Sequence, residues 1–340
     1  MRAALVRTLP TSTLELEEVE EPQPGPAEVL VEIEACGICG TDLHILAGES
    51  YRPELPFVLG HEPVGRVVAV GTVELEHWLG RRVTMTLFAG CGTCALCRAG
   101  DERLCAALRS VLGVSAAWGG FAERLRVAAA QVIEVPDGLG ALEAAALVDA
   151  GATAANASRL LGQTPGDSAI AVVGGGPVGY LVAELLRLDG RSPVAVEPLT
   201  ARRSLLEARG FAAVESTRSL DRPFDVVVDC SGADAVPPWA LAALAPRGTL
   251  LVVGYATVPE LDLAPVARKE LALRGVRSGS RSDLERVLAL TAAGDLRLPP
   301  IQTWPVGRIN EAFAALRAGV VDGKAVIDFN SNEGGTSWTG

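Results

Sequence analysis

The sequence predicts an α/β protein in which a β-rich domain precedes a doubly wound parallel sheet of the Rossmann type. Three observations lead to this expectation. After about Ala145, apolar runs of strand length alternate with helical stretches. One of these runs enters the glycine-rich loop Gly174–Gly179, and a helix follows at once. Before Ala145, short β-branched runs are separated by turns rich in proline and glycine.

The composition is that of a globular protein with two domains. The chain has 340 residues, of which 49% are apolar and 21% charged, and one domain takes about 150 residues. These values exclude a disordered chain, a collagen-like fibre and a small disulfide scaffold. The formal net charge of -11 repels phosphate backbones, so we expect no nucleic-acid partner.

Neither a membrane segment nor secretion is expected. Ala169–Leu186 is apolar, but its four glycines, its proline and Glu184 do not suit a membrane helix. The N-terminus lacks the apolar stretch of a signal peptide. The chain has an odd number of cysteines, seven, and all but Cys230 fall in two close groups, which indicates thiolate chemistry in a reducing compartment. We therefore expect a cytoplasmic protein.

The elements follow this division in order. Strands are predicted before Ala145 in β-branched runs such as Val29–Glu34, Val64–Val70 and Ala122–Val127. Strand–helix pairs then predict a parallel sheet covered on both faces: Ala169–Val173 with Val178–Leu188, Val194–Glu197 with Ala201–Ala208, and Asp225–Asp229 with Pro237–Leu244. The remaining predicted elements are the strands Thr249–Val253, Leu271–Val276 and Ala325–Phe329 and the helices Asp283–Ala292 and Arg308–Ala318.

The glycine-rich loop predicts a dinucleotide site. Gly174, Gly176 and Gly179 have the G-x-G-x-x-G spacing, which allows backbone N–H groups to approach a pyrophosphate. Glu197 closes the next strand, where a carboxylate would bind the ribose diol. The alternative is a glycine-rich turn in another doubly wound protein. The strand before the loop, the helix after it and the acid together favour the dinucleotide.

Two groups of residues predict metal sites. Cys91, Cys94, Cys97 and Cys105 form a closed set of four thiolates that suits a structural zinc. An iron–sulfur cluster is one alternative, and a zinc ribbon for nucleic acid is another, which the acidic charge disfavours. Cys39 and His61 suit a second, open zinc site with one further ligand and a position for substrate. A single histidine is more often packed in the core than bound to a metal. Here, however, two of the three histidines lie in the segments that hold Cys39 and Glu62: His44 in CGICGTDLH and His61 in GHEPVG.

At these motifs the chain is similar to the zinc-dependent alcohol and polyol dehydrogenases of the medium-chain dehydrogenase/reductase superfamily. The most specific motif is GHEPVGRVVAVG, which begins at Gly60. The segments CGTDLH, GGFAE, GGGPVG and RINEAFAALRAGVVDGKAVIDF fall in the family's order, so the resemblance covers nearly the whole chain. It implies a GroES-like catalytic domain over residues 1–147, a Rossmann NAD-binding domain over 148–284, and a C-terminal segment, 285–340, that returns to the catalytic domain.

The resemblance also implies roles for single residues. Cys39 and His61 match the ligands of the catalytic zinc, and Asp42 matches the acid that orients the ligand histidine. Thr41 and His44 match the relay that carries the alcohol proton to water, and Glu62 matches an acid behind the zinc that can approach the metal. The positions that match cofactor contacts are Gly174, Gly176, Pro177, Val178, Gly179, Glu197 and Arg202.

Three features depart from the family pattern. The third zinc ligand is usually Cys or Glu, and its position here falls on Asp149, a competent but shorter and harder ligand. The usual Gly-Asp-Arg-Val before the cysteines is replaced by Gly80–Val83, with Arg81 in place of the acid, and the loop Thr72–Leu79 is unusual. Positions that line the substrate cannot be matched, although Phe88 and Trp118 are candidates.

The expected activity is that of a zinc-dependent alcohol dehydrogenase, with two Zn²⁺ ions per chain, NAD and a homodimeric or homotetrameric assembly. One alternative is a zinc-free quinone or enoyl reductase of the same superfamily, which would lack Cys39, His61 and the four cysteines. Another is a zinc-stabilised nucleotide-binding regulator, which would need no proton relay. NAD is expected rather than NADP because Glu197 repels a 2′-phosphate, although Arg202 and Arg203 could attract one.

Overall fold

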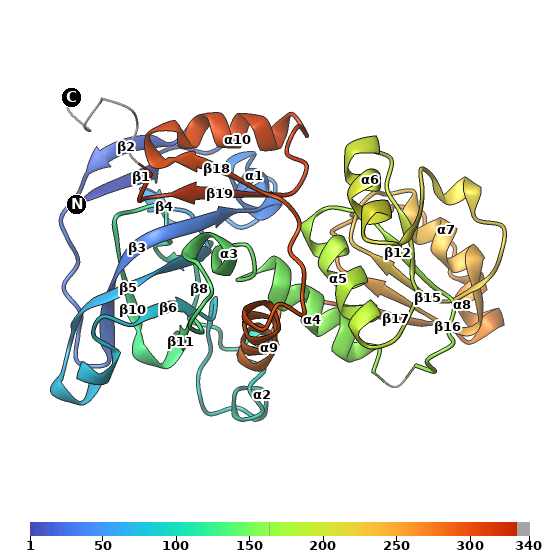
Figure 1. Cartoon of the computed structure of the whole chain (residues 1–340), viewed down its shortest axis with the longest axis horizontal. Helices are drawn as coiled ribbons and strands as arrows, with labels where there is room; N and C mark the ends of the chain where they lie inside the picture. The colour runs from blue at the N-terminus through green and yellow to red at the C-terminus, as the bar shows by residue number, and fades with distance from the viewer. Residues whose placement is uncertain (163, 332–340) are drawn as a thin grey trace. The chain divides into compact units, whose positions relative to one another are not determined.

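The computed structural model describes residues 1–162 and 164–331, and the chain forms two compact units (Figure 1). The first unit comprises Met1–Asp149, Ser280–Ala292 and the residues from Pro300 onward. The second unit comprises Ala150–Gly279 and Ala293–Pro299. Within the described residues, no helix is long and apolar enough to cross a membrane.

The first unit is organised around one long strand, β3 (Glu28–Ile38). One edge of β3 pairs antiparallel with β5 (Glu62–Val70). The opposite edge is shared by β10 (Arg124–Ala128), which pairs with its first half, and by β19 (Lys324–Asp328), which pairs with its last residues. The C-terminal strand is thereby built into the sheet beside the end of β3. The sheet is completed by β6 (Arg82–Met85), β11 (Val132–Glu134) and β18 (Ile301–Pro305).

Two smaller sheets and several short helices complete this unit. One sheet has the order β2-β1-β4, made of Glu15–Glu18, Arg2–Val6 and Phe57–Val58. The other has the order β7-β8-β9, made of Phe88–Ala89, Ser110–Leu112 and Ala116–Ala117. The helices are α1 (Gly40–Leu46), α2 (Ala95–Arg98), α3 (Ala141–Ala145), α9 (Arg281–Ala292) and α10 (Ile309–Arg317). The loop Thr72–Leu79 holds a 3₁₀ helix, Val73–Trp78.

The second unit is a six-stranded parallel sheet with the order β14-β13-β12-β15-β16-β17. This order runs outward in both directions from β12 and confirms the predicted doubly wound sheet. The strands are β12 (Ile170–Val173), β13 (Val194–Val196), β14 (Ala212–Val214), β15 (Phe224–Asp229), β16 (Leu244–Val252) and β17 (Ala272–Gly275). The helices are α4 (Ala150–Leu160), α5 (Pro177–Leu188), α6 (Thr200–Ala208), α7 (Val236–Ala243) and α8 (Ala264–Lys269).

The core of this sheet explains why its strands could be read from the sequence. All four residues of β12 are buried, and so are Val194, Ala195 and Val196 of β13. Helix α7 packs Val236, Ala240 and Leu241 into the same apolar cluster. Strands buried on both faces are apolar throughout, which is the pattern that the sequence shows.

Candidate active site and metal centres

The turn that opens α1 brings three of the predicted site residues together. Cys39 precedes the helix, and its backbone N–H donates to Oδ2 of Asp42 at 2.9 Å. The other oxygen of Asp42 lies 3.3 Å from Nδ1 of His61, and both side chains are buried. A carboxylate at Nδ1 holds the imidazole in the tautomer whose Nε2 can bind a metal. Asp42 therefore fixes both the start of the helix and the orientation of His61.

Nε2 of His61 faces two further atoms that could bind a metal. Oδ2 of Asp149 lies 3.9 Å from this nitrogen and 3.7 Å from Sγ of Cys39. Bonds of about 2.0–2.3 Å to a tetrahedral zinc would separate such ligand atoms by about 3.4–3.6 Å. One sulfur, one nitrogen and one oxygen therefore suit zinc in chemistry, and the two measured separations are slightly longer than a bound zinc would set. Glu62 places a fourth ligand atom within 4.8 Å of the other three.

The electrostatics of this group favour a cation. Burial lowers the pKa of His61, but the carboxylate of Asp42 and the side chain of Cys39 raise it by more, so its pKa is well above the ordinary value. The negative potential that favours a proton on His61 also favours a metal ion in the same place.

A lysine that the sequence analysis did not identify lies beside this group. Nζ of Lys324 contacts both oxygens of Glu62, at 2.6 Å and 2.5 Å, and both side chains are buried. Burial lowers the pKa of Lys324, but the carboxylate of Glu62 raises it by more, so the lysine stays charged. The only sequence signal was that Lys324 is one of just two lysines in the chain.

The two residues of the predicted proton relay differ in their surroundings. Thr41 lies next to the donor group, with Oγ1 at 3.8 Å from Sγ of Cys39. His44 lies one turn further along α1 with 54% of its side chain exposed, and its Nδ1 is 2.8 Å from Oε2 of Glu49. Thr41 thus lies beside the possible metal ligands, and His44 lies at the solvent-exposed surface. The transfer of a proton between them stays a prediction.

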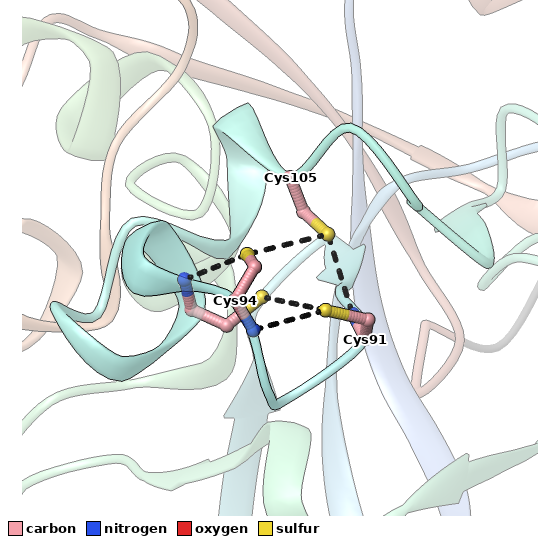
Figure 2. Close-up of side chains that lie close together, drawn as sticks. Cys91, Cys94 and Cys105 are labelled. Atoms are coloured by element: carbon pink, nitrogen blue, oxygen red, sulfur yellow. Dashed lines mark hydrogen bonds between the residues drawn. The ribbon is translucent and has the colours of Figure 1, made fainter.

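The four predicted cysteines of the second metal site converge around one point, and Figure 2 shows three of them, Cys91, Cys94 and Cys105. Sγ of Cys91 lies 3.9 Å from Sγ of Cys97, and Sγ of Cys94 lies 3.9 Å from Sγ of Cys105. A tetrahedral zinc with Zn–S bonds of about 2.3 Å would separate its sulfurs by about 3.8 Å. The four thiolates therefore fit zinc without rearrangement.

Backbone N–H groups already stabilise thiolates at this site. Hydrogen bonds from the hydroxyl and backbone N–H of Thr93 and from the N–H of Cys94 lower the pKa of Cys91 to about 5. Burial raises the pKa of Cys97 to about 12, so this thiol would lose its proton on binding the metal.

The glycine-rich loop has the close approaches that the dinucleotide motif requires. Gly174 has φ +97°, and a Cβ on Gly179 would lie 1.8 Å from the carbonyl oxygen of Gly174. Only glycine fits at these two positions, of which Gly174 follows β12 and Gly179 lies in the first turn of α5. Pro177 and Val178 begin α5. Proline has no N–H, so the backbone N–H groups that this helix start offers to a phosphate begin with Val178.

Glu197 is placed beside this loop and is also part of its structure. Its carboxylate is buried and accepts hydrogen bonds from the N–H groups of Gly175 at 2.7 Å and Leu199 at 2.8 Å. Arg203 donates to the carbonyl oxygens of Glu197 and Pro198. The guanidinium of Arg202 lies near Gly176, 3.9 Å from the position of a Cβ there. The sequence predicted the position of the acid but not its bonds to the loop.

Comparison with known proteins agrees with this arrangement. Residues 25–137 match the family described as alcohol dehydrogenase GroES-like domain, and residues 205–327 match the family described as zinc-binding dehydrogenase. An alcohol dehydrogenase of Geobacillus stearothermophilus is 33% identical over 96% of this chain and 98% of its own length. An L-threonine 3-dehydrogenase of Saccharopolyspora erythraea is 30% identical over the same shares.

A solved structure shares the fold over nearly its whole length. The acetophenone reductase of Geotrichum candidum, solved in complex with NAD, is 29% identical with a TM-score of 0.88. The match covers 97% of this chain and 98% of that one.

The chain belongs to the zinc-dependent alcohol dehydrogenase type of the medium-chain dehydrogenase/reductase superfamily. It is an oxidoreductase that acts on CH–OH groups. The predicted fold class is confirmed, with its GroES-like domain and its Rossmann sheet. The predicted cofactors, zinc and NAD, are also supported by the two donor clusters and by these relatives.

Proposed function

We propose that this protein is a zinc-dependent alcohol dehydrogenase that transfers a hydride reversibly between NAD and a primary or secondary alcohol, including polyols, sugars or specialised metabolites. The observation that carries the proposal is the convergence of Cys39, His61 and Asp149, with Asp42 behind the histidine. The names of two relatives, L-threonine 3-dehydrogenase and acetophenone reductase, favour a small alcohol or ketone as the substrate.

Each residue then has a defined task. Zinc supplies a Lewis acid that lowers the pKa of the substrate hydroxyl, and NAD supplies the hydride acceptor. Cys39, His61 and Asp149 would hold the metal. Thr41 stands beside these ligands and would accept the hydroxyl proton, which His44 would pass to solvent from its exposed position.

The four cysteines would hold a second zinc with a structural role. Their set is closed and leaves no position for a substrate. The segment between Cys91 and Cys105 contains only short helices, Ala95–Arg98 and Glu102–Leu104, so the metal would supply much of its order. Because this site needs reduced thiols, we propose that the protein works in the cytoplasm.

The proposed function is tested by metal analysis together with coenzyme reduction on a panel of alcohols. We expect two zinc ions per chain and NADH formation that depends on the alcohol. A chain that holds zinc but reduces neither coenzyme with any alcohol on the panel would support the nucleotide-binding regulator instead. Turnover of quinones or enoyl substrates without zinc would support the zinc-free reductase.

The same assay tests the coenzyme preference. We expect wild type to prefer NAD and Glu197→Ser to shift the ratio of kcat/KM values toward NADP by about tenfold or more, because the variant removes a buried charge beside the ribose site. Glu197→Gln is the matched control, since it keeps the size of the side chain and one of the two acceptor oxygens used by Gly175 and Leu199 but carries no charge. A preference for NADP in wild type, or an unchanged preference in both variants, would overturn the assignment.

We also propose a homodimer or homotetramer in which the open edge of β17 pairs with a second copy. Among the described residues β17 pairs only with β16, and all four of its residues are exposed. An exposed edge strand offers unpaired backbone groups that a two-fold-related copy can complete.

Light scattering on purified protein tests this assembly. We expect Leu273→Lys on β17 to shift the mass toward the monomer, because a charged edge strand resists pairing. Leu79→Lys is the control, since Leu79 is 45% exposed and Leu273 44%. An unchanged mass for Leu273→Lys would place the interface elsewhere.

A further inference from the structure

The carboxylate of Glu62 is a fourth possible ligand at the proposed catalytic zinc site. It lies within 4.8 Å of the ligand atoms of Cys39, His61 and Asp149 and is fully buried. A zinc that bound all four groups would be closed, like a structural site, and would have no position for a substrate. If the site proposed above is catalytic, something must keep Glu62 from binding the metal.

Lys324 makes the contacts that could do this. Its ammonium lies 2.6 Å and 2.5 Å from the two oxygens of Glu62 and donates to the carbonyl oxygen of Ile38 at 3.0 Å. The ammonium therefore donates a hydrogen bond to Oε1 and lies within ion-pair distance of both oxygens. Lys324 is itself 3% exposed, so water does not compete for the pair.

Gly37 provides the space in which this carboxylate rests. A Cβ at residue 37 would lie 1.8 Å from Oε2 of Glu62 and 3.1 Å from the carbonyl oxygen of Ala145. Gly37 and Lys324 come from the paired strands β3 and β19. The pairing of these two strands brings Gly37 and Lys324 together around the Glu62 carboxylate. We call this position the seat of Glu62.

We propose that Lys324 is a positioning residue that holds Glu62 in this seat and so leaves the fourth zinc position to the substrate. A buried carboxylate without a partner is strongly destabilised. When Lys324 is removed, the nearest cation that can compensate Glu62 is the catalytic metal. The result is a metal with four protein ligands that binds tightly but resists any further ligand.

A purely structural role for Lys324 makes a different prediction. Lys324 also ties the start of β19 to the end of β3 through Ile38, and its loss could simply loosen the site. In that case, a second substitution that removes the ligand capacity of Glu62 would not restore the site. Under our proposal it would.

The experiment uses protein whose labile zinc has been exchanged for cobalt, whose visible absorption reports its ligands. Imidazole is titrated as a neutral probe, so that the change in charge does not by itself alter its affinity. We expect Lys324→Met to bind imidazole at least about tenfold more weakly than wild type. We expect Lys324→Met with Glu62→Gln, and Lys324→Arg alone, to bind it within about threefold of wild type.

Lys269→Met is the matched control. Lys269 is the only other lysine and donates to three backbone carbonyls, those of Leu241, Ala242 and Leu244, in the second unit. This variant should bind imidazole as wild type does. If Lys324→Met does not fold, Lys324→Gln takes its place, because it keeps a donor for Ile38 but has no charge for Glu62.

Two results would overturn the proposal. One is a wild-type imidazole affinity in the folded Lys324 variant. The other is a double variant that binds imidazole as weakly as the single one, which would assign Lys324 a structural role. If wild type takes up no cobalt after the labile zinc is removed, the metal site of the proposed function is itself wrong, and this inference is lost with it.

Discussion

Replacing Asp149 with asparagine is expected to lower kcat/KM by more than about 100-fold and to remove zinc from the catalytic site. Substitutions behind the ligands typically cost about 10–100-fold, and loss of a ligand should cost more. Oδ2 of Asp149 is the oxygen that lies near both Sγ of Cys39 and Nε2 of His61. A neutral amide at this point keeps the shape of the side chain but is a poor zinc ligand. Metal analysis and steady-state kinetics on the same preparation measure both effects.

Asp149→Cys serves as the control for this experiment. It restores a ligand atom of the type that the family more often uses, so it should retain more zinc than the asparagine variant. The zinc held by the four cysteines should remain in both. Normal zinc content and normal turnover in Asp149→Asn would show that the third ligand lies elsewhere, with Glu62 as the first candidate because it is the remaining donor of the group.

Mild chelation is expected to remove about one of two zinc ions, to abolish activity and to leave the fold intact. The difference in lability follows from the two donor sets: four thiolates enclose one ion, whereas three protein ligands leave the other open to a competing ligand. Metal analysis, activity and circular dichroism are followed together during dialysis. Adding zinc back should restore the activity.

The order in which the two zinc ions are lost decides whether the two sites differ as proposed. Loss of both ions together, with loss of structure, would mean that the two sites are not distinct in kind. Iron in the freshly purified protein, or a single zinc, would contradict the assignment of the cysteine cluster or of the open site.

The parts of the structure that could be predicted from the residues alone are those with a pattern within a short stretch of sequence. The spacing of Gly174 and Gly179 marked the loop, because a side chain at either position would meet backbone. The cysteines from Cys91 to Cys105 marked their site, because ligands so close in the chain can converge without help from the rest of the fold. The apolar strands of the parallel sheet were predicted for a similar reason.

Elements without a local pattern were missed. Helix α4 is made almost entirely of small side chains, and nine of its eleven residues are buried, so it lacks the one-sided apolar stripe by which a helix is recognised. Strand β14 has three residues and none is fully buried. The predicted strand Thr249–Val253 was too short, because β16 begins at Leu244, directly after α7. Strand β18 and helix α8 were also not predicted.

Contacts between distant parts of the chain limited how much of the active site could be predicted from the sequence. Asp149 lies 110 residues from Cys39 in sequence, and its assignment came from a family resemblance rather than from any pattern around it. Lys324 lies 262 residues from Glu62. Nothing near either residue indicates their ion pair, because it depends on β19 pairing with β3. The sequence and the family resemblance therefore indicated the candidate ligands but not the lysine that pairs with Glu62.

Because Lys324 lies on β19, the order in which the chain is synthesised affects the proposed metal site. Cys39, His61, Glu62 and Asp149 all precede residue 150, whereas Lys324 is synthesised long after them. The second unit, nearly contiguous from Ala150 to Gly279, can fold in the interval. A nascent chain that captures zinc early does so while Glu62 has no lysine beside it. Under the proposal above, the pairing of β19 with β3 would then bring Lys324 to Glu62 and free the fourth position of the metal.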